Sequence, residues 1–163
     1  MRSFTYLAIG LALGFFQGSM EVAWSLGGPT PDLLLLYVLW LGSRRQTGCA
    51  MLVGFLGGIL QDAVGLFRPV GVHSLCKVIA AYLPEGAHFI LVAENRLTGL
   101  LLVAAATLIQ QAVLLTIIQT FEPGGVWGAK VVLEALAMLT WHLILWFLVV
   151  GRLPVARELE AGA

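Results

Sequence analysis

Residues 97–121 read LTGLLLVAAATLIQQAVLLTIIQTF and contain no Asp, Glu, Lys or Arg. A helix needs about 20 mostly apolar residues to cross the hydrocarbon core of a bilayer, so this stretch is long enough to span a membrane. Its apolar residues follow one another without the alternation of period two that a membrane β-barrel requires. The stretch therefore predicts a transmembrane helix.

The whole chain has a similar character. Of its 163 residues, 60% are hydrophobic and 11% are charged, and the mean hydropathy is +0.94. Because a soluble domain carries about 25% charged residues, we exclude a soluble enzyme, a nucleic-acid-binding protein and a disordered chain. The net charge is zero, and the two cysteines, Cys49 and Cys76, lack the spacing of a redox or zinc site. These observations indicate an integral membrane protein.

Several apolar stretches predict an all-α bundle of about six transmembrane helices that forms a single domain over residues 1–163. The expected spans are residues 4–24, 31–42, 47–66, 71–84, 97–121 and 126–150. The fourth is the least defined, because Pro84 and Glu85 interrupt it. Residues 84–96 then either lie on the membrane or extend the fourth span, kinked, to residue 93.

The distribution of basic residues predicts the orientation of this bundle. An even number of spans places both termini on one side of the membrane, and six arginines fall on that side: Arg2, Arg44, Arg45, Arg96, Arg152 and Arg157. Only Arg68 and Lys130 fall on the other side. Since cytoplasmic loops carry the excess of Lys and Arg, we expect both termini in the cytoplasm.

Small residues recur every four positions on two of the expected spans. They are Gly10, Gly14 and Gly18 on the first, and Ala50, Gly54 and Gly58, followed by Asp62, on the third. Such stripes allow helix backbones to approach closely. We expect them to pack within this chain, and an interface with a partner protein is the less favoured alternative.

Polar residues inside a membrane are costly and therefore informative. Asp62 ends the small-residue stripe of the third span, and His73 and Lys77 lie four residues apart on one face of the fourth. We expect Asp62 to pair with Lys77, with His73, or with both. An ion pair that fixes the two helices is favoured over a polar site for a ligand or partner.

Structural roles are also expected for the other polar residues of the spans. Asp32 follows Pro31 at the start of the second span, where a carboxylate caps a helix. Gln110 and Gln111 lie mid-span and need partners on other helices. The remaining candidates are Glu21 near the interface, a Lys130–Glu134 pair along the sixth span, and His142 deeper in it.

Recognisable catalytic motifs are missing from the sequence. It has no HExxH, no G-x-S-x-G, no P-loop and no G-x-G-x-x-G, and its three histidines are scattered. We therefore expect no catalytic residue, no cofactor and no metal. An intramembrane enzyme is the least favoured class, because no pair of catalytic groups is evident.

Four short motifs, taken together, point to a family. They are PDLLLL at residues 31–36, GFLGGILQD at 54–62, GVHSL at 71–75 and AYL at 81–83. Their order and spacing resemble the rod shape-determining protein MreD family over most of the chain. One departure concerns residues 84–96, which are often strongly basic in that family. Here Arg96 and His88 are the only basic residues of this segment.

The resemblance implies a small, non-catalytic protein of the bacterial inner membrane that belongs to the cell-elongation machinery. It implies action with MreC, the MreB filament, RodA and a class B penicillin-binding transpeptidase. It also implies a fold similar to the substrate-binding subunit of energy-coupling-factor transporters, with six helices.

Two hypotheses for the function follow. The first is a multi-pass scaffold that binds MreC and helps to position peptidoglycan synthases, surrounded by membrane lipid. Its candidate structural or partner-contact residues are Asp32, Gly54, Gly58, Asp62, Gly71, His73 and Lys77. The alternative is a vitamin-type, small-molecule-binding subunit of a membrane transporter. That protein would need a solvated cavity lined by residues such as Asp62, His73, Lys77 and Glu134.

Overall fold

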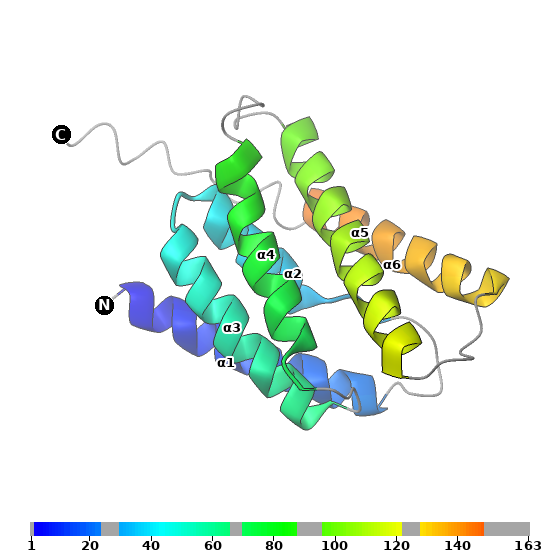
Figure 1. The fold of residues 1–163 in the computed structure, drawn as a ribbon. Helices are drawn as coiled ribbons and strands as arrows, with labels where there is room; N and C mark the ends of the chain where they lie inside the picture. Colours follow the sequence, from blue (N-terminus) through cyan, green and yellow to red (C-terminus); the bar gives the residue numbers. More distant parts are fainter. Residues whose placement is uncertain (1, 24–29, 66–69, 88–95, 122–127, 149–163) are drawn as a thin grey trace.

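The computed structural model describes residues 2–23, 30–65, 70–87, 96–121 and 128–148. These residues form six helices and no strand, which confirms the predicted all-α class (Figure 1). The helices are α1 (Arg2–Ala23), α2 (Leu33–Ser43), α3 (Thr47–Val64), α4 (Val72–Ala87), α5 (Arg96–Phe121) and α6 (Ala129–Leu148).

The six helices differ in length in a way that matters for the site. Four of them, α1, α3, α5 and α6, are long and apolar enough to cross a membrane. In contrast, α2 has 11 residues, which at 1.5 Å per residue extend about 16 Å, or roughly half of a hydrocarbon core. Helix α4 has 16 residues, about 24 Å, and contains Pro84 near its end. The crossing of six complete spans therefore stays a prediction.

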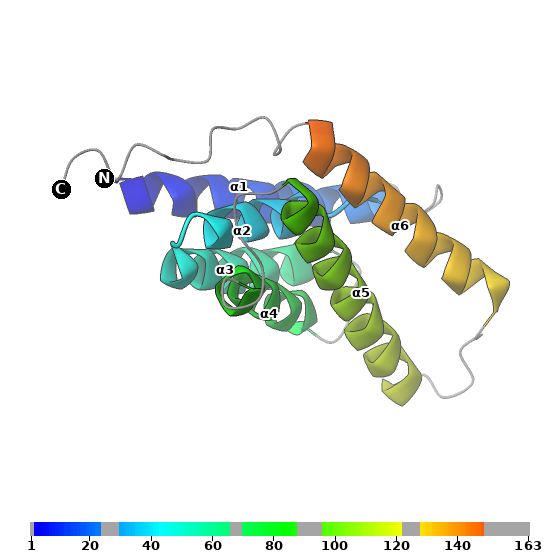
Figure 2. The ribbon, with the colours of Figure 1, turned by 90° about the horizontal axis from the view of Figure 1, so that it is seen from above.

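Helix α3 lies between α1 and α4, and small residues line both of its contacts (Figures 1 and 2). On the α1 side, a Cβ added to Gly14 would collide with the backbone of Gly57, and one added to Gly18 would lie 2.7 Å from the carbonyl oxygen of Gln61. The Gly10–Gly14–Gly18 stripe is thus covered by α3. This confirms the expectation that it packs within the chain.

The opposite side of α3 approaches α4 just as closely. A Cβ added to Gly58 would lie 2.5 Å from the backbone of Ser74, and one added to Gly54 would lie 3.1 Å from Lys77. The Ser74 hydroxyl donates a hydrogen bond across this contact to the carbonyl oxygen of Phe55. Gly54 and Gly58 therefore bring α4, with its polar residues, against α3.

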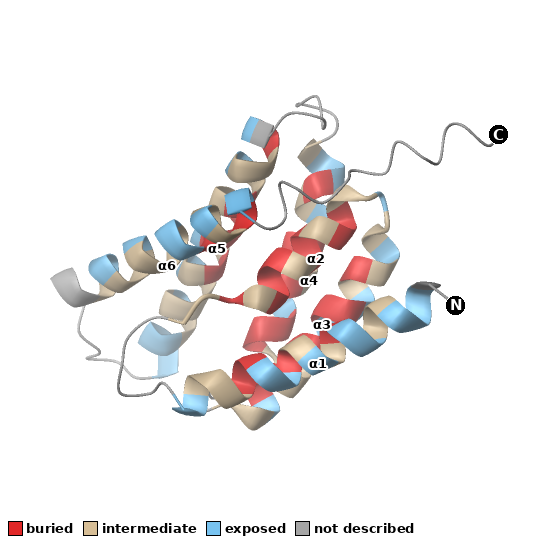
Figure 3. Cartoon of the chain, turned by 180° about the vertical axis from the view of Figure 1, so that it is seen from behind, coloured by how far each residue is buried: buried red, intermediate tan, exposed pale blue. Residues whose placement is uncertain are grey.

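Helix α2 supplies the centre of the hydrophobic core. One cluster joins α2 to α4, α5 and α6: Leu35, Leu36, Leu39, Ala80, Val103, Ala106 and Trp146. A second cluster joins it to α3 and α4: Leu34, Val38, Leu41, Ala50, Val53 and Ala81. Figure 3 shows the buried residues concentrated on α2, α3 and α4, whereas α6 is mostly exposed or half-buried. The short helix is therefore surrounded by the others.

Replacement of Gly58 by alanine tests this close packing. The added methyl group meets backbone atoms of α4, so we expect Gly58→Ala to destabilise the protein by about 1–3 kcal/mol. Gly48→Ala in the same helix is the matched control, because a Cβ there meets nothing within 4 Å. Thermal unfolding of the detergent-solubilised variants measures the difference. Equal melting temperatures would contradict the close approach of α3 and α4.

Candidate functional site: a buried polar centre around Asp32

The first turn of α2 begins at Asp32, inside the bundle. The Asp32 side chain accepts a hydrogen bond from the Leu35 backbone N–H, with 3.0 Å between Oδ1 and N. The predicted helix cap is thereby confirmed. Only 2% of the residue is exposed, so the carboxylate lies where water cannot solvate it. A buried charge of this kind requires a partner of opposite charge and further hydrogen bonds.

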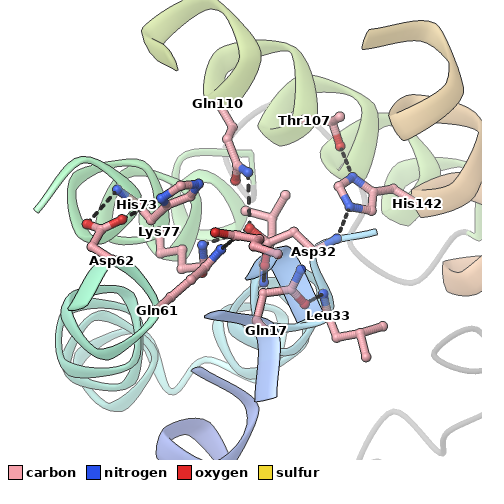
Figure 4. A network of polar contacts seen from close by, with 12 residues as sticks. Gln17, Asp32, Leu33, Gln61, Asp62, His73, Lys77, Thr107, Gln110 and His142 are labelled. Carbon is pink, nitrogen blue, oxygen red and sulfur yellow. Dashed lines mark hydrogen bonds and ion pairs between the residues drawn. The ribbon is translucent and has the colours of Figure 1, made fainter. Parts of the chain in front are cut away.

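Two helices supply those partners to the other carboxylate oxygen (Figure 4). Lys77 Nζ of α4 lies 2.7 Å from Asp32 Oδ2, and Gln110 Nε2 of α5 lies 3.0 Å from the same atom. The Lys77 side chain is fully buried. Opposite charges at this distance compensate one another for the loss of hydration, and the ion pair links α2 to α4. Gln110 extends the link to α5, which confirms that this mid-span glutamine has an interhelical partner.

The backbone of the same turn is held from α6 and α1. The Asp32 N–H donates to Nε2 of His142 over 2.8 Å, and the Leu33 N–H donates to Oε1 of Gln17 over 3.2 Å. These bonds satisfy backbone N–H groups at the start of α2 that have no partner within the helix. Side chains from four helices therefore converge on the first turn of α2.

The contacts of His142 fix its tautomer. Nε2 accepts from Asp32, so Nδ1 carries the ring proton and donates to the Thr107 hydroxyl over 2.9 Å. That hydroxyl donates in turn to the carbonyl oxygen of Val103 over 2.8 Å. The histidine is therefore neutral in this arrangement, and the chain of hydrogen bonds joins α6 to α5 and to α2.

A second buried carboxylate organises the start of α4. Asp62 Oδ1 lies 2.5 Å from Nδ1 of His73, and Asp62 Oδ2 accepts hydrogen bonds from the N–H groups of Gly71 (2.6 Å) and His73 (3.3 Å). Gly71 has a φ of 102°, a left-handed conformation that residues other than glycine rarely adopt. Asp62 thus holds the turn at Gly71 and fixes α4 relative to α3.

Of the two partners expected for Asp62, singly or together, the structure has one. Asp62 pairs with His73, but Lys77 pairs with Asp32. The physical reason is position along α4, because Lys77 lies one turn beyond His73 and reaches the buried start of α2 instead. The remaining carboxylate nearby, Glu21, is half-buried and accepts a hydrogen bond from Gln61 Nε2 over 2.5 Å.

The structure therefore places the seven candidate residues inside the bundle or at its turns. Asp32 and Lys77 form one pair, Asp62 and His73 another, and Gly71 forms the turn before α4. Gly54 and Gly58 allow the α3–α4 contact described above. The expected Lys130–Glu134 pair stays a prediction, because the Lys130 side chain lies outside the described residues.

Sequence reasoning assigned Asp32 a cap and Gln110 and His142 structural roles, but it did not bring them together. Lys77, Gln110 and His142 lie 45, 78 and 110 residues from Asp32 in the chain. Helical periodicity carries no information on contacts between residues so far apart. A usable signal was charge balance: Lys77 needs an anionic partner within the membrane, and Asp32 is one of few carboxylates in the expected spans.

The chemistry of this centre is that of a structural joint. Its ion pairs and hydrogen bonds connect α1, α2, α4, α5 and α6 at one turn of the chain. Within the described ranges, no group of three or more His, Cys, Asp and Glu residues is arranged to hold a metal ion. The residues of the centre are engaged with one another.

Comparison with known proteins gives one finding. The model of the family described as rod shape-determining protein MreD matches residues 1–153. No curated protein and no solved structure matches the chain.

A double-mutant cycle tests the Asp32–Lys77 pair. We expect Asp32→Asn or Lys77→Met alone to cost about 3–5 kcal/mol of stability, because each leaves one buried charge uncompensated. The combined variant should lose clearly less than the sum of the two. As a matched control, Asp62→Asn combined with Lys77→Met should be additive to within about 0.5 kcal/mol. Strong coupling in the control pair and none in the first would contradict the pairing described here.

Proposed function

Because the chain belongs to the MreD family of rod shape-determining proteins, we propose that it is a non-catalytic scaffold that binds MreC and helps to position peptidoglycan synthases. The observation that carries the proposal is the family match over residues 1–153 of 163. It makes the chain a membrane protein with a role in the determination of rod shape, and its four long apolar helices agree with that. The scaffold role and the binding of MreC are the further step.

The polar groups of the bundle support a structural role over a catalytic one. The two buried carboxylates, Lys77, His73 and His142 make contacts that fix one helix against another. A catalytic site, in contrast, needs groups that face a substrate. The same contacts favour the scaffold over a vitamin-type binding subunit. Three of the four residues proposed to line a solvated cavity, Asp62, His73 and Lys77, are held in ion pairs instead.

The surface that we propose for MreC is the exposed side of α6. The small-residue stripes of α1 and α3 are covered within the chain, so they do not offer a free face for a partner. Helices α5 and α6 diverge from the other four (Figure 2). The exposed apolar residues of α6 are Val132, Leu133, Leu136, Trp141, Ile144, Phe147 and Leu148. A partner bound there would contact α6 without disturbing the polar centre.

The remaining partners and the location complete the proposal. We place the protein in the bacterial inner membrane as a multi-pass protein with both termini in the cytoplasm, following the distribution of arginines. RodA, a class B penicillin-binding transpeptidase and the MreB filament would be reached through MreC. The exposed apolar residues that no partner covers would contact membrane lipid.

Deletion and affinity purification test the function. Cells that lack the protein, and have no second copy of its gene, should become round, because synthases would no longer be positioned along the rod. Affinity purification from membranes in mild detergent should recover MreC. Glu85→Gln, at an exposed position at the end of α4, provides a control that should retain both rod shape and MreC. Rod-shaped deletion cells, or purified protein free of MreC, would contradict the proposal.

Photocrosslinking tests the surface separately. A photoreactive residue in place of Leu133 or Leu136 on α6 should crosslink to MreC in cells, because both side chains point outward. The matched control is Phe15 or Phe16 on α1, which are similarly exposed but lie on the other part of the bundle. Crosslinks from α1 and none from α6 would show that MreC binds at α1 and not at α6, and would contradict the proposed surface but not the binding of MreC.

A further inference from the structure

Two buried carbonyl groups, one in the polar centre and one on α3, lack a hydrogen-bond donor among the described residues. Gln110 is 2% exposed and Gln61 is 1% exposed, and the Oε1 atom of each accepts no hydrogen bond from the described residues. An unpaired buried acceptor has lost its hydration without compensation, so native proteins rarely retain one. The orientation of the Gln110 amide is fixed, because Asp32 Oδ2 accepts and therefore requires the Nε2 side of the amide. Rotation of this amide cannot remove the unpaired carbonyl.

Unused donors lie beside the unpaired carbonyl of Gln110. The Lys77 ammonium has three N–H donors, and its hydrogen bond to Asp32 Oδ2 uses one of them. Lys77 Nζ and Gln110 Nε2 are neighbours, because both bind the same oxygen atom. Figure 4 shows Gln61 directed toward the same region from α3. The centre thus presents N–H donors and a carbonyl acceptor side by side.

We propose that this position binds a hydroxyl group. Its oxygen accepts a hydrogen bond from Lys77 Nζ, and its proton is donated to Oε1 of Gln110. A hydroxyl group fits because it is both donor and acceptor. Two sources share this chemistry: a bound water molecule, or a small neutral molecule that carries a hydroxyl group.

Charge and size further restrict which molecules could bind at this position. Asp32 and Lys77 neutralise each other, so the position has no net charge that would compensate an ion for its loss of hydration. The residues that surround the position, Asp32, Gln61, Lys77 and Gln110, are all at least 98% buried, so the occupant has few atoms. Buried water commonly makes about three hydrogen bonds to such polar groups. The inference is independent of the proposed scaffold role, because it concerns only the interior of the bundle.

Solid-state NMR on the full chain in lipid bilayers tests the proposal. With ¹⁵N-labelled glutamine, magnetisation transferred from water should reach the side-chain amide of Gln110 several-fold faster than that of Gln17. Gln17 is the matched control, because it is equally buried but its Oε1 accepts a hydrogen bond from Leu33. The Gln110 signal is identified by ¹³C–¹⁵N correlation in the native protein, so no variant has to fold.

A second measurement distinguishes the two sources. Protein purified in detergent is denatured, and the released material is analysed by mass spectrometry for a stoichiometric neutral hydroxyl compound. Fast transfer to Gln110 supports water as the occupant. Slow transfer together with a released compound supports the organic source. Equal transfer to Gln110 and Gln17, with nothing released, overturns the proposal.

Discussion

The arrangement of this bundle depends on the neutralisation of one buried carboxylate. Asp32 begins a helix in the interior of the protein, where an unpaired charge would cost several kcal/mol. It is tolerated because Lys77 supplies the opposite charge and Leu35 and Gln110 supply hydrogen bonds. Each of these partners has to arrive from a defined direction. The requirement therefore positions α4 and α5 relative to α2, and not merely against a common apolar core.

The short helix α2 explains why such a charge lies inside at all. A helix of 11 residues extends only about half of the membrane thickness, so one of its ends has to lie within the bundle. The N–H groups at that end need acceptors in a region that bulk water does not reach. Asp32, Gln17 and His142 provide them. The polar centre thus follows from the fact that α2 begins inside a membrane protein. The ion pair with Lys77 follows from the use of an aspartate to cap that helix.

The sequence predicted the parts of this architecture that are local. Apolar length predicted the helices, four-residue spacing predicted the packing of Gly14 and Gly58, and position after Pro31 predicted the cap at Asp32. The Asp62–His73 pair was within reach because it joins consecutive helices through a short turn. The pairing of Lys77 with Asp32 could not be predicted in this way, because a helical face shows which residues share a side but not which distant helix covers that side. For the same reason the acceptor role of His142, 110 residues from Asp32, had no local signal.

Two kinds of packing divide the molecule into parts with different freedom. Helices α1, α3 and α4 are joined through glycines at backbone distance, so their relative position is set by main-chain contact and leaves little room for adjustment. Helices α5 and α6 diverge from this body, and hydrogen bonds of Gln110 and His142 join them to Asp32 at the start of α2 (Figure 2). Apolar side chains such as Val103 and Trp146 add attraction at this joint but little directional preference. The hydrogen bonds of Gln110 and His142 therefore supply a directional contribution to the placement of the α5–α6 pair. A partner bound along the exposed side of α6 would thus contact a helix whose buried side is tied to Asp32 through His142.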